Sequence, residues 1–308
     1  MKKRIARRGF IKGSIGWSAA GILGISTNLS ASNEPLAAPK HLFKLSLNLY
    51  SFNRLLREGE VDLFDMLDFC AKYNFEAIDP TGYYFPDYPA VPSDEYIYRF
   101  KRQAFLLGLD ISGTGVRNDF AQADAAKRAK DIELIKQWIV AAAKMGCPHV
   151  RIFTGRSKTT DHSRAEVFAW IAAAIKECCT EAAKYGVMIS LQNHNEFLQD
   201  ADEVDQLFEM VDSPWLGLNL DIGSYRQKDP YAEIAQNIKH AITWQIKENV
   251  WINGKETPTD YVRLFRIIKQ ANYRGYLPLE TLGAGDPFEK VPRLLEQVKA
   301  AILEVEGS

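Results

Sequence analysis

The chain has 308 residues, of which 46% are hydrophobic and 25% charged, a composition typical of a globular protein long enough to bury a large core. The formal net charge is -1, but residues 1–32 contain six Lys or Arg and no acid, so the remainder has 32 basic and 39 acidic residues and a charge of -7. This acidic remainder argues against a nucleic-acid partner.

The N-terminal segment has the pattern of a twin-arginine signal peptide. Arg7 and Arg8 are followed by Lys12, an apolar stretch and a few small residues. The apolar stretch is shorter than the ~20 residues that a spanning helix needs, so we expect no stable membrane span. We therefore predict a signal peptide at residues 1–32, a linker at 33–41, and a periplasmic or otherwise exported protein.

Strand-like and helix-like hydrophobic patterns alternate along the rest of the chain. The predicted strands are 43–49, 76–79, 109–112, 149–153, 187–191, 216–221, 243–246 and 276–280. The predicted helices are 61–73, 93–107, 124–145, 164–185, 201–211, 230–239, 260–271 and one after 286. Eight such units predict an α/β fold, a (β/α)8 TIM barrel forming a single domain over residues 42–308. The alternative is a doubly wound open sheet, but no GxGxxG turn follows the first strand.

Four of the later strands end in polar side chains. The segments are 189–197 (ISLQNHNEF), 216–226 (LGLNLDIGSYR), 242–250 (ITWQIKENV) and 275–283 (GYLPLETLG). The carboxyl ends of parallel strands meet at one rim of a barrel, where active sites of this fold lie. We therefore expect four side chains to lie together there: Gln192, Asp221, Gln245 and Glu280.

The motifs LQNH, LDIGS, QIKE and LPLETLG resemble the xylose isomerase-like sugar isomerase/epimerase superfamily, and the resemblance covers about residues 43–303. It implies a metal site whose ligands are Glu, Asp, His and Glu, at positions that correspond here to Gln192, Asp221, Gln245 and Glu280. Two of these are neutral amides, which ligate hard cations weakly. One divalent metal, Mg²⁺ or Mn²⁺, and a site without metal are both open.

The resemblance also implies proton transfer at a carbon next to a carbonyl. Glu280 is the best candidate for the base, and Lys247 is the electrophile or acid if no metal binds. His194 is a further candidate for a catalytic residue, either as a substitute metal ligand or as a group that contacts the substrate. Because Gln192 cannot act as a base, two-base epimerisation is in doubt unless another carboxylate replaces it, and isomerisation, elimination or hydration with one base stays open.

Other polar and aromatic groups near the strand ends suit a sugar. Aromatic rings stack on the apolar face of a sugar, although Trp244 is also compatible with a place in the core. Arginines hold hydroxyl or carboxylate groups. The predicted substrate-binding residues are Asn48, Tyr83, Arg151, Asn193, Arg226, Trp244 and Glu248.

These features predict an exported isomerase/epimerase-like enzyme that acts on a small carbohydrate. A lyase or hydratase of keto-sugars or 3-keto-glycosides is the first alternative, and a barrel that only binds carbohydrate is the second. The four cysteines form no CxxC motif or Cys/His cluster, so we expect them to be core or helix-face thiols. Nothing in the sequence indicates an oligomeric state.

Overall fold

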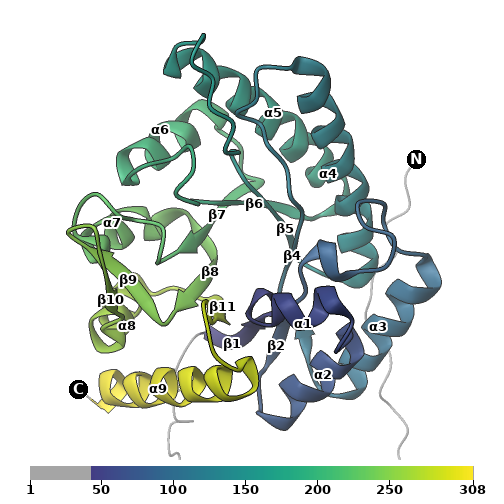
Figure 1. The fold of residues 1–308 in the computed structure, drawn as a ribbon, viewed down its shortest axis with the longest axis vertical. Helices are drawn as coiled ribbons and strands as arrows, with labels where there is room; N and C mark the ends of the chain where they lie inside the picture. The colour runs from purple at the N-terminus through teal and green to yellow at the C-terminus, as the bar shows by residue number, and fades with distance from the viewer. Residues whose placement is uncertain (1–42, 308) are drawn as a thin grey trace, which may run out of the picture. The chain divides into compact units, whose positions relative to one another are not determined.

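Eight parallel strand positions form a closed ring, and helices lie on its outside (Figure 1). The computed structural model describes residues 43–307, so the predicted signal peptide at 1–32 and linker at 33–41 lie outside the described residues. Residues 43–307 form the predicted α/β TIM barrel, as one domain.

Nine strands make up the sheet, in the order β3-β2-β1-β11-β8-β7-β6-β5-β4, and each neighbouring pair is parallel. Their bounds are β1 Phe43–Asn48, β2 Ala77–Asp79, β3 Asp110–Ile111, β4 Thr114–Gly115, β5 His149–Ile152, β6 Met188–Gln192, β7 Leu216–Asp221, β8 Ala241–Lys247 and β11 Gly275–Glu280.

The third barrel position is shared by two short strands rather than the single strand predicted at 109–112. β3 pairs with β2, and β4 pairs with β5. Gly113 lies between them, where a Cβ atom would come within 2.3 Å of Cε1 of His149. Because glycine leaves room for the His149 imidazole, the chain can pass this ring between β3 and β4. Pairing changes there from β2 to β5, and this change closes the barrel.

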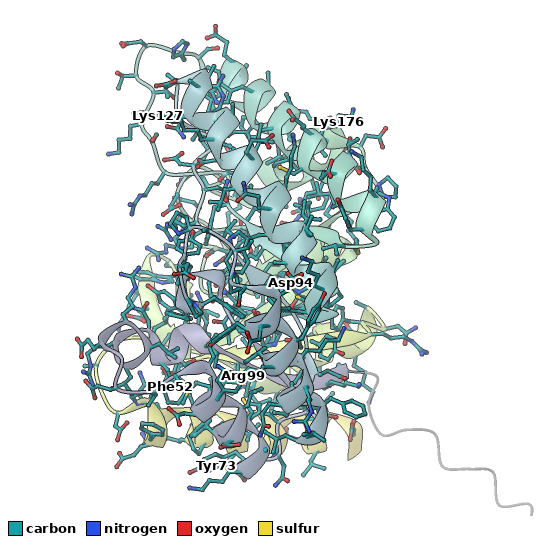
Figure 2. All side chains as sticks on the ribbon, turned by 90° about the vertical axis from the view of Figure 1, so that its right-hand side faces the viewer. Phe52, Tyr73, Asp94, Arg99, Lys127 and Lys176 are labelled. Atoms are coloured by element: carbon teal, nitrogen blue, oxygen red, sulfur yellow. The ribbon has the colours of Figure 1, made fainter. Side chains whose placement is uncertain are left out.

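Side-chain caps fix the starts of most barrel helices. In α2 and α5, for example, Asp62 and Ser163 form capping boxes with Asp65 and Glu166. The helices are α1 Asn53–Glu58, α2 Leu63–Lys72, α3 Asp94–Leu106, α4 Ala125–Met145, α5 Arg164–Tyr185, α6 Ala201–Val211, α7 Pro230–Asn237, α8 Tyr261–Gln270 and α9 Pro287–Gly307. The 3-10 helices are η1 Leu49–Phe52, η2 Gly82–Tyr84 and η3 Ile238–His240. Figure 2 shows Arg99 of α3 and Lys127 of α4 among the charged side chains of this helical layer.

Side chains on the barrel strands alternate between a polar interior and an apolar layer beneath the helices. In β8, Thr243 and Gln245 are buried polar residues, while Trp244 and Ile246 belong to the hydrophobic core. The interior of the barrel therefore carries polar groups up to the carboxyl ends of its strands.

A hairpin that was not predicted follows β8. Its strands are β9 Asn249–Ile252 and β10 Lys255–Pro258, which pair antiparallel as a separate two-stranded sheet. Asn253 and Gly254 form the turn, with φ of 52° and 72°. An Asn-Gly pair in this left-handed conformation is typical of a two-residue hairpin turn.

All four cysteines are buried free thiols, which confirms that prediction. Within residues 43–307, no helix combines the length and the apolar character that crossing a membrane requires.

Candidate active site

Lys247 lies between two carboxylates at the carboxyl end of the barrel. Its Nζ atom is 2.7 Å from Oδ2 of Asp221 and 3.1 Å from Oε2 of Glu280. These residues end β8, β7 and β11, which are neighbours in the sheet, and the register of β8 and β11 places Lys247 beside Glu280. Asp221, Lys247 and Glu280 are called the charged triad below.

Burial and mutual attraction set the protonation of the charged triad. Burial raises the pKa of Glu280, and the attraction of Lys247 offsets only part of this rise. Burial also disfavours the charge of Asp221, but there Lys247, together with His194 and the hydrogen bond from Gln192, outweighs it and lowers the pKa. Burial disfavours the charge of Lys247 too, yet the two carboxylates raise its pKa overall. Lys247 is therefore protonated, and Glu280 is the more basic carboxylate.

The amides of Gln192 and Gln245 bond to protein groups beside Asp221. Nε2 of Gln192 donates to Oδ2 of Asp221 at 2.8 Å and to Oε1 of Gln245 at 2.7 Å, while its Oε1 accepts from Nη1 of Arg151 at 3.3 Å. With the Gln245 amide turned by 180°, its oxygen accepts instead from Arg151 at 3.0 Å and Asn48 at 3.2 Å. In either orientation, protein donors engage both amide oxygens.

This donor set does not fit a divalent metal. Of the four positions that the resemblance assigns to metal ligands, Asp221 and Glu280 provide anionic oxygens, and each has an oxygen in contact with Lys247. The remaining positions, Gln192 and Gln245, provide amide oxygens that already accept hydrogen bonds. In the part of the chain that the structure describes, no three His, Cys, Asp or Glu side chains form a group that could hold a metal.

The charged triad faces a cavity of about 230 Å³. The predicted residues His194, Arg226 and Glu248 also line this cavity. Polar and charged groups make up most of its walls, together with the ring of Trp251. A small cavity with many hydrogen-bonding groups and an aromatic wall suits a small hydroxylated molecule.

The β9–β10 hairpin, which was not predicted, supplies walls of this cavity. Asn249, Trp251 and Glu256 line the cavity, and Nδ2 of Asn249 donates to Oε1 of Glu256 at 3.1 Å. The guanidinium of Arg226 lies 4.4 Å from the centre of the Trp251 ring. The Asn-Gly dipeptide at the hairpin turn was the sequence signal that could have revealed this wall.

His194 lines the cavity but contacts Glu196 rather than the charged triad. Its Nδ1 atom is 3.5 Å from Oε1 of Glu196, and its ring packs edge-on against Phe153. Burial lowers the pKa of His194, and the negative charges of Asp221 and Glu196 offset only part of this effect. The imidazole is therefore neutral near pH 7 and suits hydrogen bonding better than charge stabilisation.

Three predicted substrate-binding residues have structural roles. Asn193 holds the backbone of Asp221, with Oδ1 accepting from its N–H at 2.7 Å and Nδ2 donating to its carbonyl at 3.2 Å. Asn48 caps η1 by accepting from a backbone N–H at 2.9 Å. Trp244 is fully buried and packs edge-on against Tyr273, so the prediction that it contacts a sugar is corrected by the alternation of β8, which turns it away from the interior.

Arg151 is a buried cation at the end of β5, next to Gln192. Its Nε and Nη2 atoms have no hydrogen-bond partner among the described residues. Burial disfavours its charge, but Tyr83, Asp79 and Glu280 raise its pKa overall. Burial also raises the pKa of Asp79 to about 6, against the attraction of Arg151. Buried donors without protein partners are satisfied by water or a ligand, which keeps Arg151 a candidate for substrate binding.

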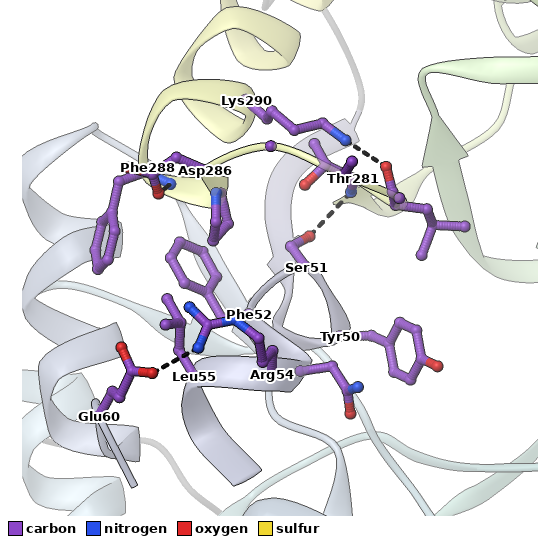
Figure 3. Close-up of a pocket in the computed structure, with 16 residues that line it drawn as sticks. Tyr50, Ser51, Phe52, Arg54, Leu55, Glu60, Thr281, Asp286, Phe288 and Lys290 are labelled. Carbon is purple, nitrogen blue, oxygen red and sulfur yellow. Dashed lines mark hydrogen bonds and ion pairs between the residues drawn. The ribbon is translucent and has the colours of Figure 1, made fainter. Parts of the chain in front are cut away.

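A second cavity, of about 830 Å³, shares Leu282 and Gly283 with the first. Figure 3 shows Tyr50, Phe52 and Arg54 on one side of it and the segment after β11 on the other. In that segment, Lys290 donates to the carbonyl of Leu282 and pairs with Glu248 at 3.0 Å. Residues 281–290, which follow β11, therefore separate the two cavities. The ion pair between Lys290 and Glu248 fixes this segment to the wall of the first cavity.

Comparison with known proteins identifies relatives of this barrel. The profile of a family described as "Xylose isomerase-like TIM barrel" matches residues 67–301. Among curated protein sequences, none matches this chain.

Several solved structures share the fold at low sequence identity. A 3-keto-D-glucoside 4-epimerase from E. coli is 14% identical with a TM-score of 0.67, covering 84% of this chain and 99% of that one. A probable 3-DHS dehydratase from Bacillus anthracis is 17% identical with a TM-score of 0.66, covering 83% and 99%. A xylose isomerase-like TIM barrel protein from Mycobacterium smegmatis, in complex with magnesium, is 18% identical with a TM-score of 0.65, covering 86% and 99%. At these identities the similarity shows the fold.

Proposed function

Because this chain belongs to the xylose isomerase-like TIM barrel family, we propose that it is a sugar-converting enzyme that moves a proton at a carbon next to a carbonyl. The observation that carries the proposal is the charged triad. A buried carboxylate of raised pKa lies beside a fixed ammonium group, and both face a polar cavity. Enolisation needs this combination, a base for the carbon-bound proton and a positive charge for the developing oxyanion.

Each member of the charged triad has a distinct role in this reaction. Glu280 takes the proton from carbon, and the electron pair of the broken C–H bond moves to the carbonyl oxygen. Lys247 donates a hydrogen bond to that oxygen and stabilises its charge. Asp221, whose pKa is lowered, stays ionised and holds the ammonium group in place. A proton then passes from the neighbouring hydroxyl group to the former carbonyl oxygen, and Glu280 returns the carbon-bound proton to the former carbonyl carbon, which gives an isomerised sugar.

The carboxylate of Glu280 has one oxygen available for the substrate. Lys247 contacts Oε2, and no residue within 43–307 donates a hydrogen bond to Oε1. Since Glu280 lines the cavity, Oε1 is the atom that would receive the proton.

Elimination or hydration of a keto-sugar is the second candidate reaction. Gln192 favours it, because an amide stands where the family resemblance implies a second acid-base glutamate. With one base, the enolate collapses by expelling a leaving group or by reprotonation on the same face. Structures of the same fold include an enzyme acting on a 3-keto-glucoside and a probable dehydratase, which supports both candidates.

We also propose that the enzyme is exported and acts on a free or oxidised small sugar. The paired arginines Arg7 and Arg8 and the apolar stretch behind them support export. The polar walls of the cavity around the charged triad support a hydroxylated ligand.

Incubation with sugars and 3-keto-sugars in deuterated water tests the proposal. Deuterium at a single carbon supports enolisation, and release of an aglycone supports the elimination. Binding without exchange or cleavage would instead identify a barrel that only binds carbohydrate, and would contradict the proposal.

The variant is Glu280→Gln, and the control is Glu209→Gln, because Glu209 is exposed on α6 and does not line the cavity. General-base catalysis contributes roughly 10²–10⁴-fold, so Glu280→Gln should lower the exchange rate by about that factor while the melting temperature is maintained. Glu209→Gln should leave the rate nearly unchanged. Equal rates in the wild type and Glu280→Gln would remove Glu280 from the mechanism.

A further inference from the structure

We propose that the ammonium group of Lys247 takes the place of a divalent metal in this barrel, so that the site works without a resident metal ion. The binding part of this inference stands on the geometry of the site alone. Its catalytic part rests on the proposed function.

The position of the ammonium group is the first argument. Asp221 and Glu280 lie where the resemblance implies two of the anionic metal ligands, and Nζ of Lys247 is 2.7 Å and 3.1 Å from one oxygen of each. The cation nearest to both carboxylates is therefore the ammonium group of Lys247, which is part of the protein. A metal ion bound to the same two oxygens would lie beside Nζ, and two cations at that distance repel each other strongly in a buried site.

The local charge is the second argument. Asp221, Glu280 and Asp79 carry three negative charges when all are ionised, and Lys247 and Arg151 carry two positive charges, so the net charge is -1. Gln192 and Gln245 add none, because both are amides. A divalent ion added to this cluster would turn that charge into +1 in a buried place, which is unfavourable.

The third argument is that the backbone and stem of Lys247 are fixed by their surroundings. Its carbonyl accepts from Oγ1 of Thr259 at 2.9 Å and from the hydroxyl of Tyr261 at 3.1 Å. Its side chain passes Gly223, where a Cβ atom would lie 3.0 Å from Cδ of the lysine. The N–H of Gly223 also donates to Oδ1 of Asp221 at 2.9 Å, so the same turn positions the carboxylate and leaves room for the lysine.

An ammonium group held in this way can replace the electrostatic role of a metal. Lysine has three N–H donors, and two of them are directed to Asp221 and Glu280. The third is left for an oxygen atom of a ligand in the cavity that Lys247 lines. That donor provides a positive charge at the carbonyl oxygen when the enolate forms.

Titration with Mn²⁺ tests the binding part without any sugar. The protein is dialysed against chelator, and free Mn²⁺ is measured from its electron paramagnetic resonance signal. We expect no stoichiometric binding by the wild type at concentrations up to about 0.1 mM, which is above the dissociation constants of intracellular buffer and sensor sites built from several carboxylates. One Mn²⁺ bound per chain at micromolar concentration, and lost in Asp221→Asn, would overturn the proposal.

A pair of engineered variants isolates the role of the lysine. Gln192→Glu with Gln245→His supplies the implied ligand set and keeps Lys247, whereas the triple variant adds Lys247→Met. We expect the triple variant to bind Mn²⁺ at least ~10-fold more tightly than the double variant, since removal of one cation frees both carboxylates. Equal affinity in the two variants would show that Lys247 does not exclude the metal. The wild-type titration judges the proposal even if a variant does not fold.

The catalytic part is tested on the same chelator-treated wild type by deuterium exchange. Exchange at an undiminished rate supports a role for Lys247 in place of a metal. Exchange lost on chelation and restored by Mn²⁺ would overturn this inference and leave the proposed function intact. Absence of exchange with every sugar, before and after chelation, would contradict the proposed function and with it the catalytic part, while the Mn²⁺ titration would still decide the binding part.

Discussion

Arg151 donates from Nη1 to Oε1 of Gln192 at 3.3 Å, and this bond orients the Gln192 amide so that its nitrogen faces Asp221. A glutamate at position 192 would present an oxygen to Asp221 instead. The arginine therefore determines that position 192 supports the carboxylate of Asp221 with a hydrogen bond rather than competing with it for a cation.

Substitution of Arg151 by lysine should weaken substrate binding more than turnover. The change keeps the charge but loses the planar guanidinium, whose Nε and Nη2 have no partner among the described residues. We expect KM to rise about 10-fold, the loss typical of a charge-assisted hydrogen bond, with kcat changed less. Steady-state kinetics on the sugar identified by deuterium exchange checks this. An unchanged KM would assign Arg151 to structure alone.

Removal of the aromatic wall should affect binding without affecting the barrel. Trp251→Ala deletes the ring that lines the cavity and stacks on Arg226, but β9 lies outside the main sheet. We expect a rise in KM of about 10-fold, in the range of a lost stacking contact, with little change in melting temperature. Lys255→Ala is the control, because Lys255 is exposed on the same hairpin. A similar rise in KM for both variants would point to distortion of the hairpin rather than loss of the ring.

His149 should make the fold sensitive to acid. Burial lowers the pKa of His149 to about 3, while the unfolded value is about 6.5. Between these values the unfolded chain binds a proton that the folded chain does not, so the stability from this group is full above pH 6.5 and is lost as the pH falls toward 3. The loss is about 1.4 kcal/mol for each pH unit in that window.

The variant His149→Gln isolates this contribution, since glutamine retains hydrogen-bonding capacity toward Ser190, whose Oγ lies 2.8 Å from Nδ1 of His149. Urea unfolding of both proteins from pH 7 to pH 4 gives the comparison. We expect a shallower loss of stability in the variant. Parallel curves would show that His149 does not control the acid response.

Export should depend on the paired arginines. Replacing Arg7 and Arg8 by lysine should keep the protein in the cytoplasm, because twin-arginine signals require the pair. Cell fractionation measures the distribution, and Arg4→Lys is the control. Equal export of the double variant and the parent would refute the twin-arginine assignment. A chain without residues 1–32 should fold normally, as judged by circular dichroism and melting temperature.

The sequence predicted the barrel and the polar strand ends because both depend on local pattern. Apolar runs that end in Gln192, Asp221, Gln245 and Glu280 required no knowledge of register. The ion pairs of Lys247 could not be predicted with the same security, since they depend on how β7, β8 and β11 align.

Two predictions differ from the structure, and the physical reasons differ. Gln245 and Lys247 were both expected at the interior rim of the barrel. Because successive side chains of a strand point to opposite faces, Trp244 and Ile246 must then point outward. The partner switch at Gly113 depends on contact with His149, which is 36 positions away, and no local pattern shows it.

In the proposed enzyme, the groups that react with the substrate and part of the wall that selects it lie on different elements, because the β9–β10 hairpin carries only the latter. The strand ends of the barrel hold the charged triad, whereas Trp251 and Glu256 lie on a two-stranded sheet whose pairing is its own. Substitutions on that hairpin can reshape the cavity without shifting the register of any barrel strand. Substrate preference can thus diverge among descendants of this chain while the reacting groups stay the same.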